Sequence, residues 1–154
     1  MQHPSRRVVL IGLVGATALG LTAYSIAGPT YGTILTPAQA FAALENSDIL
    51  LVDIRRPDEW ESTGVAQGAV PIDMRREDFV DAVLAARQSP AQPIALICAR
   101  GVRSARLARF LTQAGLTPLI DIPEGMLGSF AGPGWGRQGL PVVDWAQTDE
   151  DAKT

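Results

Sequence analysis

Short, continuous apolar runs alternate with stretches of helical periodicity along most of the chain. Such runs are typical of β-strands that are covered on both faces. The predicted strands are residues 49–54, 69–72, 94–97 and 119–122. The predicted helices start at Thr36-Pro37, at Pro57, at Asp78 and at Ser104, and the last of them ends before Gly115. Strands that alternate with helices predict an α/β fold with a parallel central sheet of about five strands, flanked by helices.

The N-terminal segment has a different pattern. Residues 8–28 carry no charge, and Arg6 and Arg7 precede them. A basic start and an apolar stretch predict an export signal or a membrane anchor, and the stretch is long enough to cross a bilayer as a hydrophobic helix. Ser5-Arg6-Arg7 resembles part of the twin-arginine signal pattern, and Ala27 is a candidate cleavage position. We therefore expect a periplasmic protein, or one that faces outward from the inner membrane of a bacterium and stays membrane-bound where the segment is not cleaved.

These patterns divide the chain into four parts. Residues 1–28 are the predicted signal or anchor, and residues 29–35 are a Gly/Pro-rich linker. Residues 36–143 are the predicted folded domain, and residues 144–154 form a polar C-terminal tail.

Composition narrows the classes of function. Of 154 residues, 47% are hydrophobic and 19% charged, which fits one folded domain. A net charge of −3 argues against a nucleic-acid-binding protein, because phosphate contacts favour a basic surface. The single cysteine, Cys98, excludes an internal disulfide and a Cys-rich zinc site. The single histidine, His3, precedes the predicted domain, which excludes hydrolases with a catalytic histidine.

Cys98 is the strongest candidate for chemistry. It ends a predicted strand and is followed by a short loop and a helix, and sites in α/β folds lie at the carboxyl ends of strands. The amides of residues 99–103, the helix dipole, Arg100 and Arg103 are expected to converge there and to form a cradle for an anion. A thiol in this cradle should lose its proton more easily than a free thiol, whose pKa is about 8.5. The alternative, a small buried apolar residue, is disfavoured by the adjacent Gly101 and arginines.

Blocks of sequence in a fixed order resemble the rhodanese-type domain. They are residues 51–60, 64–72, 98–104 and 121–126. The resemblance implies a single rhodanese-like domain over nearly all of the predicted folded part. Val65, Met126 and Phe130 depart from the family pattern, and we expect them near the rim of the substrate pocket.

The resemblance implies a sulfurtransferase. It would move sulfane sulfur from thiosulfate, or a related small sulfur-containing anion, to a thiophilic acceptor through a persulfide on Cys98, the catalytic residue. The acceptor would be cyanide or a thiol, including one on a protein. Such a cycle needs no metal and no organic cofactor, and no nucleic acid takes part. The residues implied to bind the donor are Ala99, Arg100, Gly101, Val102, Arg103 and Arg55.

Two further residues are implied to support the loop, Asp53 and Ser104. Asp53 is expected to hydrogen-bond Arg103, or else to cap its own loop. Arg55 and Glu59 lie four residues apart, so we also expect an ion pair across the short helix.

Three alternatives stay open. The first is a persulfide carrier or protein-interaction module without turnover, the second a thiol phosphatase or arsenate reductase, and the third a purely structural domain. Thiol phosphatases use Cys-x5-Arg, whereas Cys98 and Arg103 form Cys-x4-Arg, and no general acid is evident in the loop. The second alternative therefore ranks below sulfur transfer.

Overall fold

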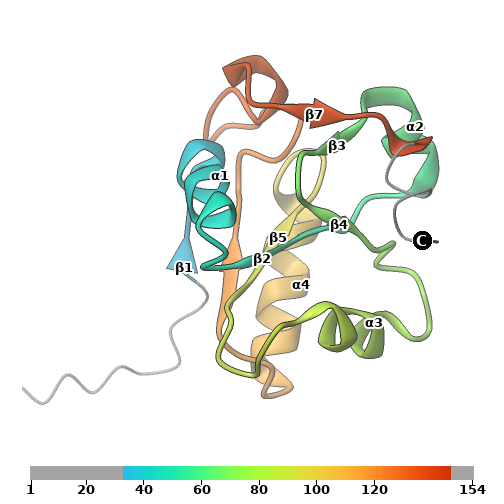
Figure 1. The fold of residues 1–154 in the computed structure, drawn as a ribbon, viewed down its shortest axis with the longest axis vertical. Coiled ribbons are helices and arrows are strands. Elements are labelled where there is room, and N and C mark those ends of the chain that lie inside the picture. Colours follow the sequence, from blue (N-terminus) through green and yellow to red (C-terminus); the bar gives the residue numbers. More distant parts are fainter. Residues whose placement is uncertain (1–32, 147–154) are drawn as a thin grey trace, which may run out of the picture.

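The protein folds around a sheet of five parallel strands in the order β1-β6-β5-β2-β4 (Figure 1). The computed structural model describes residues 33–146, so the predicted signal or anchor at 1–28 lies outside the described residues. The strands of this sheet are β1 (Thr33–Ile34), β2 (Leu50–Asp53), β4 (Val70–Pro71), β5 (Ile94–Ile97) and β6 (Leu119–Asp121). The α/β fold with a parallel central sheet of about five strands is thus confirmed.

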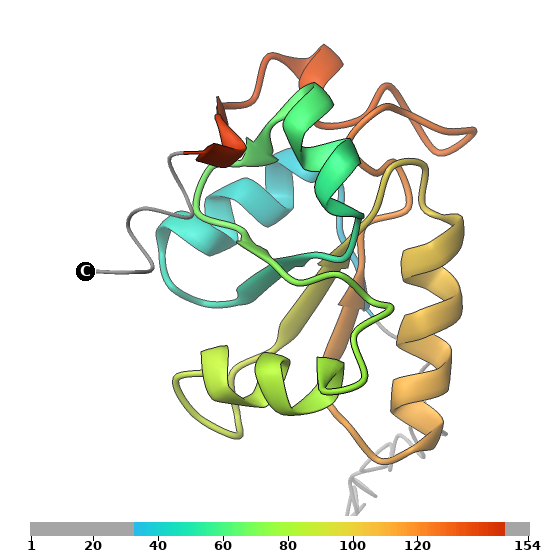
Figure 2. The same ribbon diagram turned by 90° about the vertical axis from the view of Figure 1, so that its right-hand side faces the viewer.

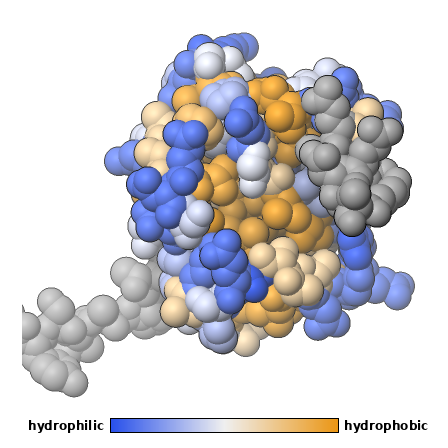
Figure 3. Space-filling view, in the orientation of Figure 1, coloured by the Kyte–Doolittle hydropathy of each residue, from blue (hydrophilic) through white to orange (hydrophobic). Residues whose placement is uncertain are grey.

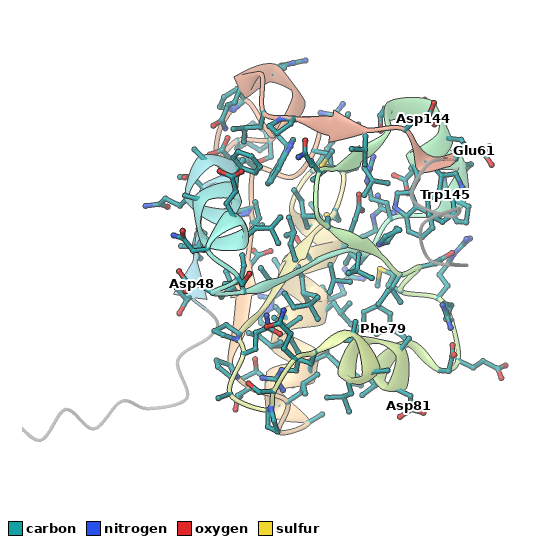
Figure 4. All side chains as sticks on the ribbon, in the orientation of Figure 1. Asp48, Glu61, Phe79, Asp81, Asp144 and Trp145 are labelled. Atoms are coloured by element: carbon teal, nitrogen blue, oxygen red, sulfur yellow. The ribbon has the colours of Figure 1, made fainter. Side chains whose placement is uncertain are left out.

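Helices cover both faces of the sheet, as Figure 2 shows from the side. They are α1 (Pro37–Glu45), α2 (Pro57–Thr63), α3 (Phe79–Ala86) and α4 (Val102–Gln113). Ala40 of α1 and Trp60 of α2 belong to the core on one face, and Val83 of α3 and Ala108 of α4 to the core on the other. Figure 4 shows Phe79 of α3 directed toward the sheet and Asp81 directed away from it. Each helix therefore buries one side, as amphipathic periodicity predicts.

The predicted start of the first helix is confirmed in atomic detail. The Thr36 hydroxyl accepts a hydrogen bond from the Gln39 amide, and the Gln39 side chain accepts one from the Thr36 amide. Pro37 takes the first helical position, where a missing amide proton costs nothing. This capping box directs the chain from β1 across the sheet.

Three strands of two residues each were not predicted. β1 lies within the expected linker at 29–35 and pairs with the edge of β6. β3 (Val65–Ala66) and β7 (Val142–Val143) form a small antiparallel sheet of their own, and η1 (Gly136–Gln138) is one turn of 3₁₀-helix before β7. Runs this short carry no periodicity of their own, because their pairing depends on distant segments.

Two predicted boundaries also differ. α4 begins at Val102 rather than at Ser104, so Ser104 lies inside its first turn. The expected polar tail at 144–154 includes Trp145, which belongs to the folded domain, because its ring packs against Trp60 with centroids 4.7 Å apart. Figure 4 shows Trp145 beside α2.

Two further properties concern the hydropathy of the surface and the lengths of the helices. Apolar surface gathers in the middle of the face in Figure 3, with hydrophilic residues around it. Among residues 33–146, no helix has the length and apolar character needed to cross a bilayer.

The register of the sheet places the candidate loop. Asp53 lies opposite Ile97 in the pairing of β2 and β5, and Leu96 lies opposite Asp121 in the pairing of β5 and β6. Because all these strands are parallel, Asp53, Cys98 and Asp121 come together at the carboxyl edge of the sheet. This edge is where α/β folds place their ligand sites.

Leu96 tests the core beneath this edge. It belongs to β5 and is fully buried in the core on the α3 and α4 side of the sheet. Leu96→Ala should therefore lower the free energy of unfolding by about 2–5 kcal/mol. Leu84→Ala, on the exposed side of α3, should change it by less than about 1 kcal/mol. Urea denaturation of both variants measures the difference, and equal losses would contradict this assignment of the core.

Candidate active site

Cys98 lies directly after β5 and is 1% exposed. Its Sγ accepts a hydrogen bond from the Gly101 amide at 3.1 Å. On its other side, its thiol donates to the Ser104 hydroxyl at 3.6 Å. The sulfur is therefore held by a backbone donor and by a side chain from the first turn of α4, as the predicted cradle requires.

Two glycines give the loop its shape. Gly101 has a φ of 80°, in the left-handed region, and a Cβ there would clash with the Pro123 carbonyl oxygen. A Cβ on Gly125 would lie 2.6 Å from the carbonyl oxygens of both Cys98 and Ala99. The loop is thus packed backbone against backbone on the 123–125 segment, and larger residues do not fit.

Hydrogen bonds from the next residues fix the peptide groups of the loop. The Cys98 carbonyl accepts from the Met126 amide and the Ala99 carbonyl from the Leu127 amide, each at 2.9 Å. These bonds orient both carbonyl groups toward the 126–127 segment. The amide that reaches Sγ belongs to Gly101, two residues further along.

Several loop amides are left for a ligand. Within residues 33–146, the amides of Ala99, Arg100, Val102 and Arg103 have no hydrogen-bond acceptor. They include the first turn of α4, whose amides point along the positive end of the helix dipole. An anion above Cys98 would meet these donors.

Arg103 is held by Glu59 rather than by Asp53. Its Nη1 and Nη2 donate to the two carboxylate oxygens of Glu59 at 2.7 and 2.6 Å. The hydrogen bond from Arg103 is the main reason that the pKa of Glu59 falls from 4.5 to about 2, against burial, which raises it. Glu59, with Cys98 as a smaller influence, raises the pKa of Arg103. The charge of the guanidinium is thus largely offset by Glu59, and both ends of its fork are occupied.

Arg55 directs its hydrogen bonds to acceptors of the protein itself, and its expected role in binding the donor stays a prediction. It is fully buried, and its Nε and Nη2 donate to the Asp53 carboxylate at 2.6–2.9 Å. Its remaining donors bind Thr63 and the carbonyls of Glu59 and Gly64. Asp53 and Arg55 therefore tie the end of β2 to both ends of α2.

This arrangement corrects two expected pairings. Asp53 does not bind Arg103 but caps its own loop, the second expected role, because its Oδ1 accepts from the Arg55 amide at 3.1 Å. The expected Arg55–Glu59 ion pair is replaced by a hydrogen bond from Arg55 to the Glu59 backbone. The Glu59 carboxylate serves Arg103 instead. The sequence analysis assigned Glu59 to Arg55 and so missed its role as the partner of Arg103. Glu59 lies in the same sequence block as Asp53 and Arg55.

A cavity of about 380 Å³ opens beside the loop. Its walls include Arg100 and Val102 from the loop, Arg137 from η1, and the residues that follow Met126. They are Leu127, Gly128, Ser129, Phe130 and Gly132. Arg100 forms no salt bridge within the described chain, and its Nη1 lies 3.4 Å from the Gly128 carbonyl oxygen. The cavity is thus apolar, with two arginines on its wall.

The three departures from the family pattern have different places. Phe130 is fully exposed at the cavity rim, as expected. Val65 and Met126 are in the core and line no part of this cavity, so their expected position at the rim is wrong. Within residues 33–146, no group of three or more His, Cys, Asp or Glu side chains is placed to hold a metal ion.

Comparison with known proteins agrees with this geometry. The sequence pattern of the rhodanese-like domain matches residues 36–128, more than half of the chain. The protein therefore belongs to the rhodanese-like domain family.

Relatives and solved structures are similar over most of their length. The thiosulfate sulfurtransferase GlpE of Actinobacillus pleuropneumoniae is 27% identical over 110 residues, which are 71% of this chain and 92% of that protein. The crystal structure of Rv0390 from M. tuberculosis has a TM-score of 0.57 and 28% identity, covering 75% of this chain and 99% of its own. The polysulfide-sulfur transferase homodimer of Wolinella succinogenes has a TM-score of 0.58 and 27% identity, covering 74% and 80%.

The buried pair of Asp53 and Arg55 predicts a large loss of stability. Arg55→Met keeps most of the side-chain volume but leaves the Asp53 carboxylate buried without its cation. We expect the free energy of unfolding to fall by about 3–5 kcal/mol in urea denaturation. Arg76→Met, which breaks an exposed pair with Asp78, should cost less than about 1 kcal/mol. Similar losses in both variants would contradict the role of the buried pair.

The pair of Glu59 and Arg103 predicts a pH dependence. Because folding lowers the pKa of Glu59 to about 2, its contribution is complete above the ordinary value of 4.5 and is lost as pH falls toward 2. Glu59→Gln should remove about 1–2 kcal/mol at neutral pH and much less near pH 2. Chemical denaturation across this range measures it. Glu61→Gln, an exposed carboxylate on the same helix, is the matched control, and a parallel profile for both variants would contradict the assignment.

Proposed function

We propose that this protein is a sulfurtransferase in which Cys98 carries sulfane sulfur as a persulfide. The observation that supports it most directly is the Gly101 amide, which donates to Sγ at the N-terminal end of α4. A backbone donor and a helix dipole stabilise negative charge on sulfur without any change of conformation. The same donors serve the thiolate and the terminal sulfur of a persulfide.

The proposed cycle has two displacements. The Cys98 thiolate attacks the outer sulfur of thiosulfate, a sulfur–sulfur bond forms on Cys98, and the original bond breaks as sulfite leaves with the electron pair. A thiophilic acceptor, cyanide or a thiolate, then attacks the outer sulfur of the persulfide. Cys98 leaves as a thiolate, so the enzyme returns to its starting state.

The charges around the loop suit an anionic donor. Arg100 is not matched by a carboxylate, whereas the charge of Arg103 is largely offset by Glu59. The loop amides of residues 99–103 supply hydrogen bonds in addition. A thiol phosphatase would need the fork of its arginine on the phosphate, and the fork of Arg103 is occupied. These contacts favour sulfur transfer over the phosphatase alternative.

The rim of the cavity favours a protein thiol as the acceptor. Val102 is 70% exposed and lies within the active-site loop, and Phe130 is fully exposed opposite it on the cavity wall. Leu127 is a further apolar residue of this cavity, which lies beside the loop that holds the nearly buried Cys98. Exposed apolar groups around a recessed site are typical of contact surfaces for other proteins.

We also propose that sulfur transfer takes place outside the cytoplasm. The support is the sequence of residues 1–28, in which Arg6 and Arg7 precede an uncharged stretch. A single reactive thiol in an oxidising compartment would be protected by its depth beneath the loop.

Sulfur loading of Cys98 tests the function. After incubation with thiosulfate and removal of excess donor, intact-mass spectrometry should show the wild type heavier by one sulfur atom. Cys98→Ser should show no gain, because its hydroxyl is a poor nucleophile toward sulfur. Added cyanide should remove the extra sulfur and release thiocyanate.

The outcomes separate the candidate functions. Loading with steady thiocyanate formation supports the enzyme, and loading without turnover favours the persulfide carrier. No loading in the wild type contradicts both. Hydrolysis of an aryl phosphate that disappears in Cys98→Ser would favour the phosphatase instead.

A further inference from the structure

The cavity beside the loop of Cys98 is larger than a small sulfur-containing anion needs. Its volume of about 380 Å³ lies within the range of about 300–1,000 Å³ that is typical of sites for organic ligands. Thiosulfate and cyanide are far smaller than such ligands, so either would leave most of this space empty. The cavity therefore has room for a larger molecule next to the active-site loop.

The outer wall of the cavity is held in place by the protein itself. Glu124 is 6% exposed, and its Oε2 accepts hydrogen bonds from the Gly134 amide at 3.0 Å and from the side-chain amide of Gln138 at 2.7 Å. The Ser129 hydroxyl donates to the Pro123 carbonyl at 2.7 Å. These contacts fix both sides of the wall segment on the residues that precede it. A wall that is already ordered loses little conformational entropy when a partner binds.

Three apolar side chains of this cavity are exposed to solvent. Phe130 is fully exposed, and Val102 and Leu127 are exposed to a lesser degree. Val102 comes from the first turn of α4 and the other two from the segment after β6, so the fold itself brings them to one cavity. Exposed apolar groups, aromatic ones above all, that gather around a cavity are typical of contact surfaces for other proteins.

The charge of the cavity has one sign. Arg100 and Arg137 lie on its wall, and no acidic residue is among the described residues that line it. Neither arginine pairs with a carboxylate within residues 33–146, whereas Arg103 of the same loop is paired with Glu59. Two uncompensated cations on a protein with a net charge of −3 are complementary to an acidic ligand.

We propose that the cavity binds a segment of a partner protein that carries the acceptor cysteine, with acidic and apolar residues next to that cysteine. The acidic side chains face Arg100 and Arg137, and the apolar ones pack on Phe130 and Val102. A protein segment fits better than a small thiol, because the apolar surface continues outward onto the exposed ring of Phe130. The inference rests on the proposed function in taking Cys98 as the carrier of the sulfur.

The transfer that this docking serves is a single displacement at sulfur. The sulfur of the acceptor thiol attacks the outer sulfur of the Cys98 persulfide anion, and a new sulfur–sulfur bond forms on the acceptor. The bond between the two sulfurs on Cys98 breaks, and its electron pair stays on Cys98 as a thiolate. The thiol proton passes to the transferred sulfur, so atoms and charge balance without an oxidant or reductant.

The test uses three capped peptides of the form X-Leu-Cys-Leu-X, in which X is Asp, Asn or Lys. The full-length protein is loaded with sulfur from thiosulfate and freed of excess donor, and intact-mass spectrometry follows the loss of the extra sulfur to each peptide. In wild type the Asp peptide should react fastest. Arg137→Glu should lower the ratio of the Asp rate to the Lys rate by about tenfold or more, because the complementary charge is reversed. The intrinsic reactivity of each peptide thiol cancels when the two proteins are compared.

Two matched controls separate the cavity from the rest of the surface. Arg106→Glu makes the same change of charge on an exposed residue of α4 that does not line the cavity, and it should keep the wild-type ratio. Phe130→Ala should slow all three peptides by about fivefold and keep the ratio, because it removes an apolar contact. Phe110→Ala, which removes another exposed ring from α4 outside the cavity, should not slow them.

Equal ratios in Arg137→Glu and Arg106→Glu would overturn the inference, because the effect would then follow from net charge alone. Phe130→Ala without any loss of rate would also overturn it. Release of thiocyanate by cyanide is measured on the same loaded samples and separates this failure from that of the proposed function. Loading and thiocyanate release without a preference among the peptides would leave sulfur transfer intact and contradict the docking site, whereas no loading at all would contradict both.

Discussion

The hydrogen bond from the Gly101 amide to Cys98 Sγ is the contact on which the rest of the site depends. It exists because the chain turns from β5 into α4 within a few residues, with Gly101 in a left-handed conformation that a side chain would prevent. The 125–127 segment packs against the other side of the loop and binds its carbonyl groups. Carbonyls held on one side and amides free on the other make a polar cradle out of backbone alone. Side chains then adjust its charge.

The charged side chains around this cradle fall into separate roles. Asp53 and Arg55 are sealed beneath it and connect β2 to α2, which is a structural task. Glu59 holds Arg103 in a bidentate pair at its flank, so this arginine adds little net charge. Arg100 alone, among the arginines of the loop, has no carboxylate partner within the described residues. A donor with negative charge therefore meets one uncompensated cation and a row of amides.

Much of this architecture follows from local sequence, and the exceptions have a common cause. Four strands and four helices were predicted because their periodicity is intrinsic to each segment, and Cys98 was found because a buried run ends there. The two-residue strands β1, β3 and β7 were missed because pairing with distant segments defines them. The expected pair of Arg55 and Glu59 was wrong because the two residues are close in sequence, whereas the fold brings Arg103 to Glu59 from far along the chain. For Asp53 the error was the opposite one, because a distant partner was expected and Arg55, two residues away, takes its carboxylate. For Asp121, the sequence predicted only a place in a strand and no contact of its carboxyl group.

Backbone and side chains divide the chemistry of the site between them. The amides of the loop cannot change their protonation, so they offer the same field to a thiol, a thiolate and a persulfide. The buried Ser104 hydroxyl, in contrast, can turn its proton, and the Cys98 thiol donates to its oxygen at 3.6 Å. The site therefore offers one fixed backbone field to every form of the sulfur, with the Ser104 hydroxyl as a side-chain contact that can either accept or donate a hydrogen bond.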